Sequence, residues 1–149
     1  MFTHRFIVDC MLEDLLRFLR IIGYDSISTD ELEDRDIKVK CLREGLTLLT
    51  RDKALYSQVR RLSIDAYLLP SDDLKENILY LKNVAKIKVD LSRTRCPKCN
   101  TILSLKDRSE LNSSVPEKYW TVFYCPKCSS TYWFGGHFNT LNDLIEELF

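Results

Sequence analysis

Four of the six cysteines lie in two short motifs whose spacing suits a metal ion. The motif C-P-K-C occurs at residues 96–99 and again at 125–128, with 25 residues between the two copies. A two-residue gap lets both thiolates of one turn reach the same ion, and four thiolates complete the tetrahedral site that suits Zn²⁺. Such a site is closed, so it predicts a structural zinc ribbon and not hydrolysis at the zinc. The expected ligands are Cys96, Cys99, Cys125 and Cys128.

The same cysteines have two other interpretations, a pair of disulfides or a redox-active C-x-x-C. A redox motif normally occurs once, beside a βαβ unit, and structural disulfides belong to secreted chains. The doubled motif therefore favours zinc held by reduced thiols, and the cytoplasm is the expected compartment. The N-terminal residues lack a signal-peptide pattern, and no apolar run reaches the roughly 18 residues that span a membrane. We expect no membrane partner.

Acidic residues follow two of the predicted strands. Asp9 comes directly after an apolar run, and Asp52 comes two residues after another. In open parallel sheets the functional crevice lies at the carboxyl ends of the strands, and neighbouring strands are about 4.8 Å apart. An acid from the start of the second helix, Asp34 or Asp36, would complete a carboxylate cluster. Carboxylates suit Mg²⁺ or Mn²⁺, which can activate water and neutralise charge on a phosphodiester.

These acids also have a structural interpretation. An aspartate after a strand is often the N-cap of the next helix, and Asp9 and Asp52 both qualify. Asp34 is ambiguous for the same reason. Spacing alone leaves metal binding and capping open for all three residues.

The distribution of charge is uneven although the formal net charge is zero. Residues 93–138 hold 7 basic and 3 acidic side chains, so the zinc module is mildly cationic and compatible with a polyanion. Zero total charge argues against tight, indiscriminate binding of nucleic acid. Four basic residues in the first half of the chain would be solvated surface charges unless they flank the cleft at the strand ends. There a guanidinium group can bind phosphate through two hydrogen bonds. The four residues are Arg17, Arg20, Arg51 and Lys53.

Hydrophobic periodicity predicts four strand–helix units in the first half of the chain. Their alternation implies a parallel, right-handed α/β sheet. A connector at 85–95 leads to the cysteine motifs, so we expect an α/β domain over residues 1–90 and a zinc-ribbon module over 91–149. The expected strands cover 6–8, 25–29, 46–50 and 65–69, and the expected helices 10–22, 35–44, 53–61 and 72–84.

Several short predictions concern the ends and faces of these helices. Asp34 is expected to cap the second helix and Gly45 to end it, and Ser71 is expected to cap the fourth. Cys10 and Cys41 lie on apolar helix patterns, which predicts buried thiols.

Motifs in both halves of the chain together match those of a known family. The matching segments are Phe6–Leu12, Leu15–Arg20, Gly23–Asp25, Glu44-Gly45 with Leu48–Asp52, Arg95–Asn100, Leu103, Val115-Pro116, Cys125–Cys128 and Tyr132–His137. In these segments the chain resembles the PIN-like ribonuclease domain with a fused zinc ribbon, the Mut-seven C-terminal RNase family. The resemblance implies a three-layer α/β/α domain with a parallel sheet, followed by a C-terminal zinc ribbon, and a metal-dependent nuclease that acts on RNA.

The resemblance also implies roles for individual residues. The acidic positions of the family correspond to Asp9 and Asp52, and Asp34 matches the acid ahead of the second helix better than Asp36. Its first-helix arginines correspond to Arg17 and Arg20. Where the family usually has glycine and a basic residue after the Met-Leu pair, this chain has two acids, Glu13 and Asp14. These acids would either weaken phosphate binding or add a metal ligand.

The last motif contains a histidine and many aromatic residues. His137 follows two glycines, and it would contact the scissile phosphate, act as a general acid, or pack in a loop against the ribbon. The aromatic side chains would stack on RNA bases or form the small core of the ribbon. They are Tyr119, Trp120, Phe123, Tyr124, Tyr132, Trp133, Phe134 and Phe138.

Two functions are consistent with the sequence. The first is a divalent-metal-dependent ribonuclease whose ribbon helps to hold RNA. The second is a non-catalytic module that docks on RNA, a ribosome or an RNA-processing complex through its zinc ribbon, with a degenerate PIN-like site. The retained acids favour the enzyme.

Overall fold

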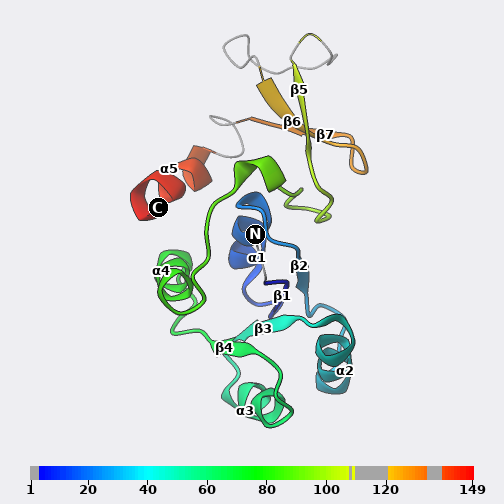
Figure 1. Ribbon diagram of the computed structural model, residues 1–149, viewed down its shortest axis with the longest axis vertical. Coiled ribbons are helices and arrows are strands. Elements are labelled where there is room, and N and C mark those ends of the chain that lie inside the picture. Colours follow the sequence, from blue (N-terminus) through cyan, green and yellow to red (C-terminus); the bar gives the residue numbers. More distant parts are fainter. Residues whose placement is uncertain (1–3, 108, 110–120, 134–138) are drawn as a thin grey trace.

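A parallel four-stranded sheet forms the centre of the first half of the chain (Figure 1). The computed structural model describes residues 4–107, 109, 121–133 and 139–149. The strand order is β2-β1-β3-β4, and both neighbours of β1 pair with it in parallel. The elements of this half are β1 (Phe6–Val8), α1 (Glu13–Ile21), β2 (Ser26–Ser28), α2 (Asp34–Glu44), β3 (Thr47–Thr50), α3 (Lys53–Arg61), β4 (Ala66–Leu68) and α4 (Leu74–Val84).

Helices cover both faces of this sheet. Neighbouring residues of a strand point to opposite faces, so the side chains of β1 show what packs on each one. Phe6 and Val8 of β1 belong to one apolar cluster with side chains of α1 and α4. Ile7, between them, belongs to a second cluster with side chains of α2 and α3. All three strand residues are fully buried. The predicted three-layer α/β/α arrangement is confirmed.

Helix ends differ from the sequence prediction by a few residues, with consequences for Cys10. Helix α1 begins at Glu13, so residues 9–12 form a loop and Cys10 is exposed; the prediction of a buried thiol was wrong there. Cys41 is buried, as predicted. Local hydrogen bonding decides these boundaries, since the amide of Leu12 donates to the Asp9 carbonyl before the helix starts.

The caps of two helices were also assigned to the wrong residue. Glu33 precedes α2 and forms a capping box with Asp36, which makes Asp34 the first helical residue. Asp73 caps α4, and the predicted cap Ser71 instead accepts a hydrogen bond from the Asp73 amide. Gly45 ends α2 with a φ of 65°, the left-handed conformation that glycine adopts readily.

The second half contains a small antiparallel sheet and a final helix. A short 3-10 turn, η1 (Leu91–Arg93), leads to β5 (Ser104–Asp107), β6 (Thr121–Cys125) and β7 (Ser130–Tyr132), which pair in that order. Figure 1 shows this sheet at one end of the molecule, with α1 between it and the parallel sheet. In the described part of the chain, no helix has the length and apolar character needed to cross a bilayer.

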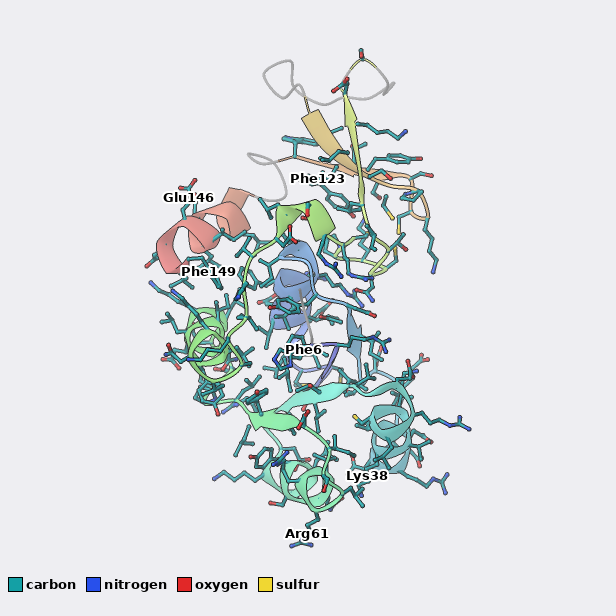
Figure 2. The ribbon with its side chains drawn as sticks, viewed as in Figure 1. Phe6, Lys38, Arg61, Phe123, Glu146 and Phe149 are labelled. Atoms are coloured by element: carbon teal, nitrogen blue, oxygen red, sulfur yellow. The ribbon has the colours of Figure 1, made fainter. Side chains whose placement is uncertain are left out.

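The final helix, α5 (Asn139–Leu148), packs on the α/β core and not on the ribbon alone. Leu144, Ile145 and Leu148 contact the cluster that contains α1 and α4. The ring of Phe149 stacks against Phe18 of α1, with ring centroids 6.4 Å apart. Figure 2 shows Phe149 at the end of α5, on the side that faces α4. Residues that follow the ribbon in sequence therefore complete the core of the first half.

Candidate active site and metal centre

The four motif cysteines come together in the ribbon. Their sulfur atoms all lie within 4.8 Å of one another, and all six cysteines of the chain are free. Cys96 and Cys125 are fully buried beside Leu103 and Tyr132. Four thiol sulfurs at this spacing are positioned to hold one metal ion, in agreement with a structural zinc.

Hydrogen bonds within the cluster separate the pKa values of the thiols. Burial raises the pKa of Cys99, but hydrogen bonds with Thr101 and with the neighbouring Cys128 and Cys125 outweigh it and lower the value to about 6. The bond with Cys99 raises the pKa of Cys128 to about 12. Burial likewise raises the pKa of Cys125, so the thiols of Cys125 and Cys128 lose their protons less readily than usual when no cation is bound. A Zn²⁺ ion binds the thiolate form of its ligands, so its binding must release protons from this site.

Arg20 links the metal centre to the α/β domain. Its Nη1 donates to the carbonyl of Pro97 at 2.8 Å, and its Nε donates to the carbonyl of Ser26 at 2.8 Å. Burial lowers the pKa of this guanidinium, while the nearby sulfurs of Cys96 and Cys99 act in the opposite direction. The side chain predicted to bind RNA thus joins α1, β2 and the first cysteine motif, and it also lines a cleft between them.

A second bridge from the ribbon lies next to it. Asn100 Nδ2 donates to Asp25 Oδ1 at 2.6 Å, and Asn100 Oδ1 accepts from the amide of Ser26 at 3.2 Å. Burial would raise the pKa of Asp25, but the hydrogen bonds from Asn100 and Arg5 hold it below its usual value. The first cysteine motif is therefore attached to the α/β domain by several hydrogen bonds.

The carboxyl ends of the central strands hold a pocket of acidic residues. After β1 the chain moves to β2 on one side and returns to β3 on the other, so the topological switch point lies between β1 and β3. Ligand crevices in open α/β sheets form at such points. Asp9 follows β1, Asp52 follows β3, and both line one pocket of about 210 Å³ together with Asp34.

Thr50 connects two of these acids. Its hydroxyl donates to Asp9 Oδ2 at 3.2 Å and accepts from the amide of Asp52 at 3.0 Å. Asp9 Oδ1 accepts from the amide of Met11, and Asp52 Oδ1 caps α3 by accepting from the amide of Leu55, both at 3.0 Å. The capping role considered for Asp52 is therefore real, and it uses one of the two carboxylate oxygens.

The two candidates for the third acid have different surroundings. Asp34 lines the pocket, whereas Asp36 Oδ2 accepts from the Glu33 amide at 3.3 Å in the capping box. Glu31, which sequence reasoning missed, also lines the pocket. It has a φ of 63°, an uncommon conformation for a residue other than glycine. The dense acidic run around it was the only signal in the sequence.

The remaining predicted site residues are either exposed or lie outside the part of the chain that the structure describes. Arg17 Nη2 pairs with Glu13 Oε1 at 2.6 Å, and both side chains are exposed. Arg51 and Lys53 are exposed on either side of Asp52. His137 lies outside the described residues, as do the aromatic residues Tyr119, Trp120, Phe134 and Phe138.

The donor set of the acid pocket suits a hard divalent cation. Carboxylate and hydroxyl oxygens are the ligands that Mg²⁺ and Mn²⁺ prefer. In the described part of the chain, the four cysteines are the only group of three or more His, Cys, Asp or Glu side chains whose ligand atoms lie close enough together to hold a metal ion directly. Mg²⁺ commonly retains several waters and uses one or two carboxylates directly, so a wider acidic pocket fits it better than a closed cage.

Comparison with known proteins identifies one family. The model of the Mut7-C RNAse domain matches residues 4–145, which cover both the α/β half and the ribbon. No curated protein and no solved structure gives a significant match.

Proposed function

The chain belongs to the Mut7-C RNase domain family, and from that premise we propose that it is a divalent-metal-dependent ribonuclease that hydrolyses RNA phosphodiester bonds. One observation carries the proposal. Asp9, Asp34 and Asp52 come from three different segments of the chain and line one pocket at the switch point of the sheet. Helix caps alone do not require that convergence.

In this proposal each acid has a defined task. Asp9 and Asp52 hold the divalent ion, and their shared partner Thr50 fixes the orientation of Asp9. The ion supplies charge neutralisation at the phosphodiester and a more acidic water. Asp34 is exposed, and we assign it to bind the ion through water. Asp36 serves the capping box and stabilises α2.

The ribbon has a separate role in the proposal. Zinc on the four thiolates stabilises the small sheet, and the ribbon then supports RNA beside the acid pocket. Its hydrogen bonds to Ser26 and Asp25 give it a fixed position on the α/β domain. A zinc ion held by four thiolates has no open position for water or substrate, so in this proposal it takes no part in the cleavage itself.

The substitution Asp52→Asn tests the catalytic assignment. Asparagine caps a helix about as well as aspartate, so the fold should remain stable, whereas loss of the charge should abolish cleavage. The matched control is Asp73→Asn, because Asp73 caps α4 through the Glu76 amide at 3.0 Å just as Asp52 caps α3. The assay measures cleavage of single-stranded RNA in Mn²⁺, together with the melting temperature of each protein.

The outcomes separate the enzyme from the alternative. Loss of cleavage in Asp52→Asn but not in Asp73→Asn supports the ribonuclease. Full activity in Asp52→Asn would leave this residue as a cap only. A wild-type protein that binds RNA but cleaves none in any divalent metal would favour the non-catalytic docking module. One observation favours that alternative: Glu13 pairs with Arg17 and adds negative charge to the cleft that Arg17 lines.

A further inference from the structure

A second cavity lies between the α/β domain and the first cysteine motif. Its volume is about 560 Å³. Arg17 and Arg20 of α1 line it on one side, and Pro97 and Lys98 of the motif line it on the other. Asp9 and Cys10 line both this cleft and the acid pocket, so the two cavities adjoin at these residues.

The wall formed by the first motif is held in place. Arg20 donates to the Pro97 carbonyl, and Asn100, which directly follows the motif, exchanges hydrogen bonds with Asp25 and Ser26. The second motif has the same C-P-K-C sequence, yet Lys127 is not among the residues that line the cleft. Two chemically identical lysines therefore have different positions relative to the cavity.

Charge is arranged along the cleft in a way that suits a nucleotide. Three acids and three cations line it: Asp9, Glu13, Asp30, Arg17, Arg20 and Lys98. Arg17 pairs with Glu13, and Arg20 donates to the carbonyls of Ser26 and Pro97. Among the described residues of the cleft, Lys98 is therefore the cation that is not already engaged and can contact a phosphate. Cavities of about 300 to 1,000 Å³ hold single small ligands, so this one has room for a nucleotide but not for a duplex. Bases in single strands can leave the stack and enter such sites, whereas a paired base must first be unpaired and unstacked, which costs free energy.

We propose that this cleft binds the nucleotide next to the scissile phosphate of single-stranded RNA, with Lys98 contacting a phosphate. The proposal rests on the proposed ribonuclease function and adds the substrate class and the role of the first motif. The zinc ribbon thus forms one side of the substrate site, and the asymmetry between its two motifs decides which lysine contacts RNA.

The test compares Lys98→Ala with Lys127→Ala in the zinc-loaded Asp52→Asn protein, so that binding is measured without cleavage. Lys127 is exposed like Lys98, carries the same charge and occupies the same place in its motif, which makes it a matched control. The probes are a fluorescent single-stranded RNA of mixed sequence and the same RNA annealed to its complement. The dissociation constant of each is measured over a series of salt concentrations.

We expect Lys98→Ala to weaken binding of the single strand roughly three- to five-fold. The slope of log affinity against log salt should become shallower by about 0.7, the value for one lost phosphate contact to a single strand. Lys127→Ala should change neither quantity. Equal effects of the two substitutions, no effect of either, or equal affinity for the duplex would overturn the proposal. Failure of the ribonuclease function would instead appear as a wild-type protein that binds but never cleaves.

Discussion

At the scale of single residues, Thr50 shows what the sequence alone did not reveal. Asp9 and Asp52 were predicted to lie at neighbouring strand ends, because they follow apolar runs, and β1 and β3 are indeed adjacent. The hydroxyl between them was part of a buried strand pattern and gave no signal. A strand periodicity predicts where a side chain points, but not which hydrogen bonds it makes.

The substitution Thr50→Val tests this link. Valine has nearly the same shape but removes the hydrogen bonds to Asp9 Oδ2 and the Asp52 amide. Loss of a residue that orients metal ligands typically costs 10- to 100-fold, so we expect a drop of roughly that size in kcat and a weaker apparent affinity for Mn²⁺. Stability should fall by about 1 kcal/mol, because the partly buried hydrogen bond from the Asp52 amide is lost.

Thr50→Ser is the control for this experiment, since it retains the hydroxyl. Most of the activity and the Mn²⁺ affinity should remain in the serine variant. A valine variant that loses stability but keeps both kcat and Mn²⁺ affinity would show that Thr50 only supports the fold.

At the scale of elements, the sequence predicted strands and helices well and their ends less well. Helix α3 spans Lys53–Arg61 as predicted, because Asp52 combines a preferred cap residue with the end of an apolar run. The cap of α2 was misplaced because three of the four residues 33–36 are acidic. The reciprocal hydrogen bonds between Glu33 and Asp36 select Glu33 as the cap. The N-cap preference of a residue type cannot decide which of these neighbouring acids is the cap, since that depends on the local backbone geometry.

The spacing of the two cysteine motifs was enough to predict that their four sulfur atoms come together. The substitution Cys96→Ser tests their role. We expect loss of bound zinc, because three thiolates do not close the tetrahedral site. The sheet β5-β6-β7 should then lose protection from hydrogen exchange, since structural zinc contributes folding free energy directly. Amides of β1 and β3 should remain protected, because their clusters contain no residue of the ribbon sheet.

Cys10→Ser is the matched control, because Cys10 is exposed and lies outside the four-sulfur group. Elemental analysis should find one zinc per chain in this variant and in the wild type. Zinc retained in Cys96→Ser at full occupancy, or no zinc in the wild type, would contradict the assignment of the ligands.

At the scale of the whole molecule, the two halves share a core. Ile21 of α1 packs in the ribbon cluster beside Cys96, and α5 returns to the cluster of α1 and α4. Lys82 Nζ donates to the Leu148 carbonyl at 2.5 Å, and Lys75 pairs with Glu147. The sequence division at residue 90 separates two kinds of element but not two independent cores. Contacts between distant segments depend on tertiary packing, which periodicity within a segment does not describe.

The bridge through Asp25 makes the attachment of the halves depend on pH. Asp25 accepts hydrogen bonds from Arg5 Nε at 3.0 Å and from Asn100 Nδ2 at 2.6 Å, and its pKa is lower in the folded protein than its usual value. A group whose pKa is depressed by folding adds stability above its unfolded pKa of about 3.9, and the gain disappears as pH falls through the folded value. The ionised carboxylate therefore stabilises the native state at neutral pH.

The variant Asp25→Asn measures that contribution. Asparagine cannot accept both charge-assisted bonds, so we expect it to be about 1–2 kcal/mol less stable than wild type at pH 7 in urea unfolding. The difference should shrink as pH falls below 4, because protonation then removes the same charge from the wild type. Loss of zinc in acid affects both proteins alike, so it cancels in the difference between their free energies of unfolding.

The control is Asp65→Asn, which makes the same charge change at a side chain that is 83% exposed. Its ion pair with Arg60 spans 3.7 Å, so this substitution should cost under about 0.5 kcal/mol. A difference for Asp25→Asn that stays constant down to pH 3 would assign its effect to lost packing, because only an ionisable contact is titrated away.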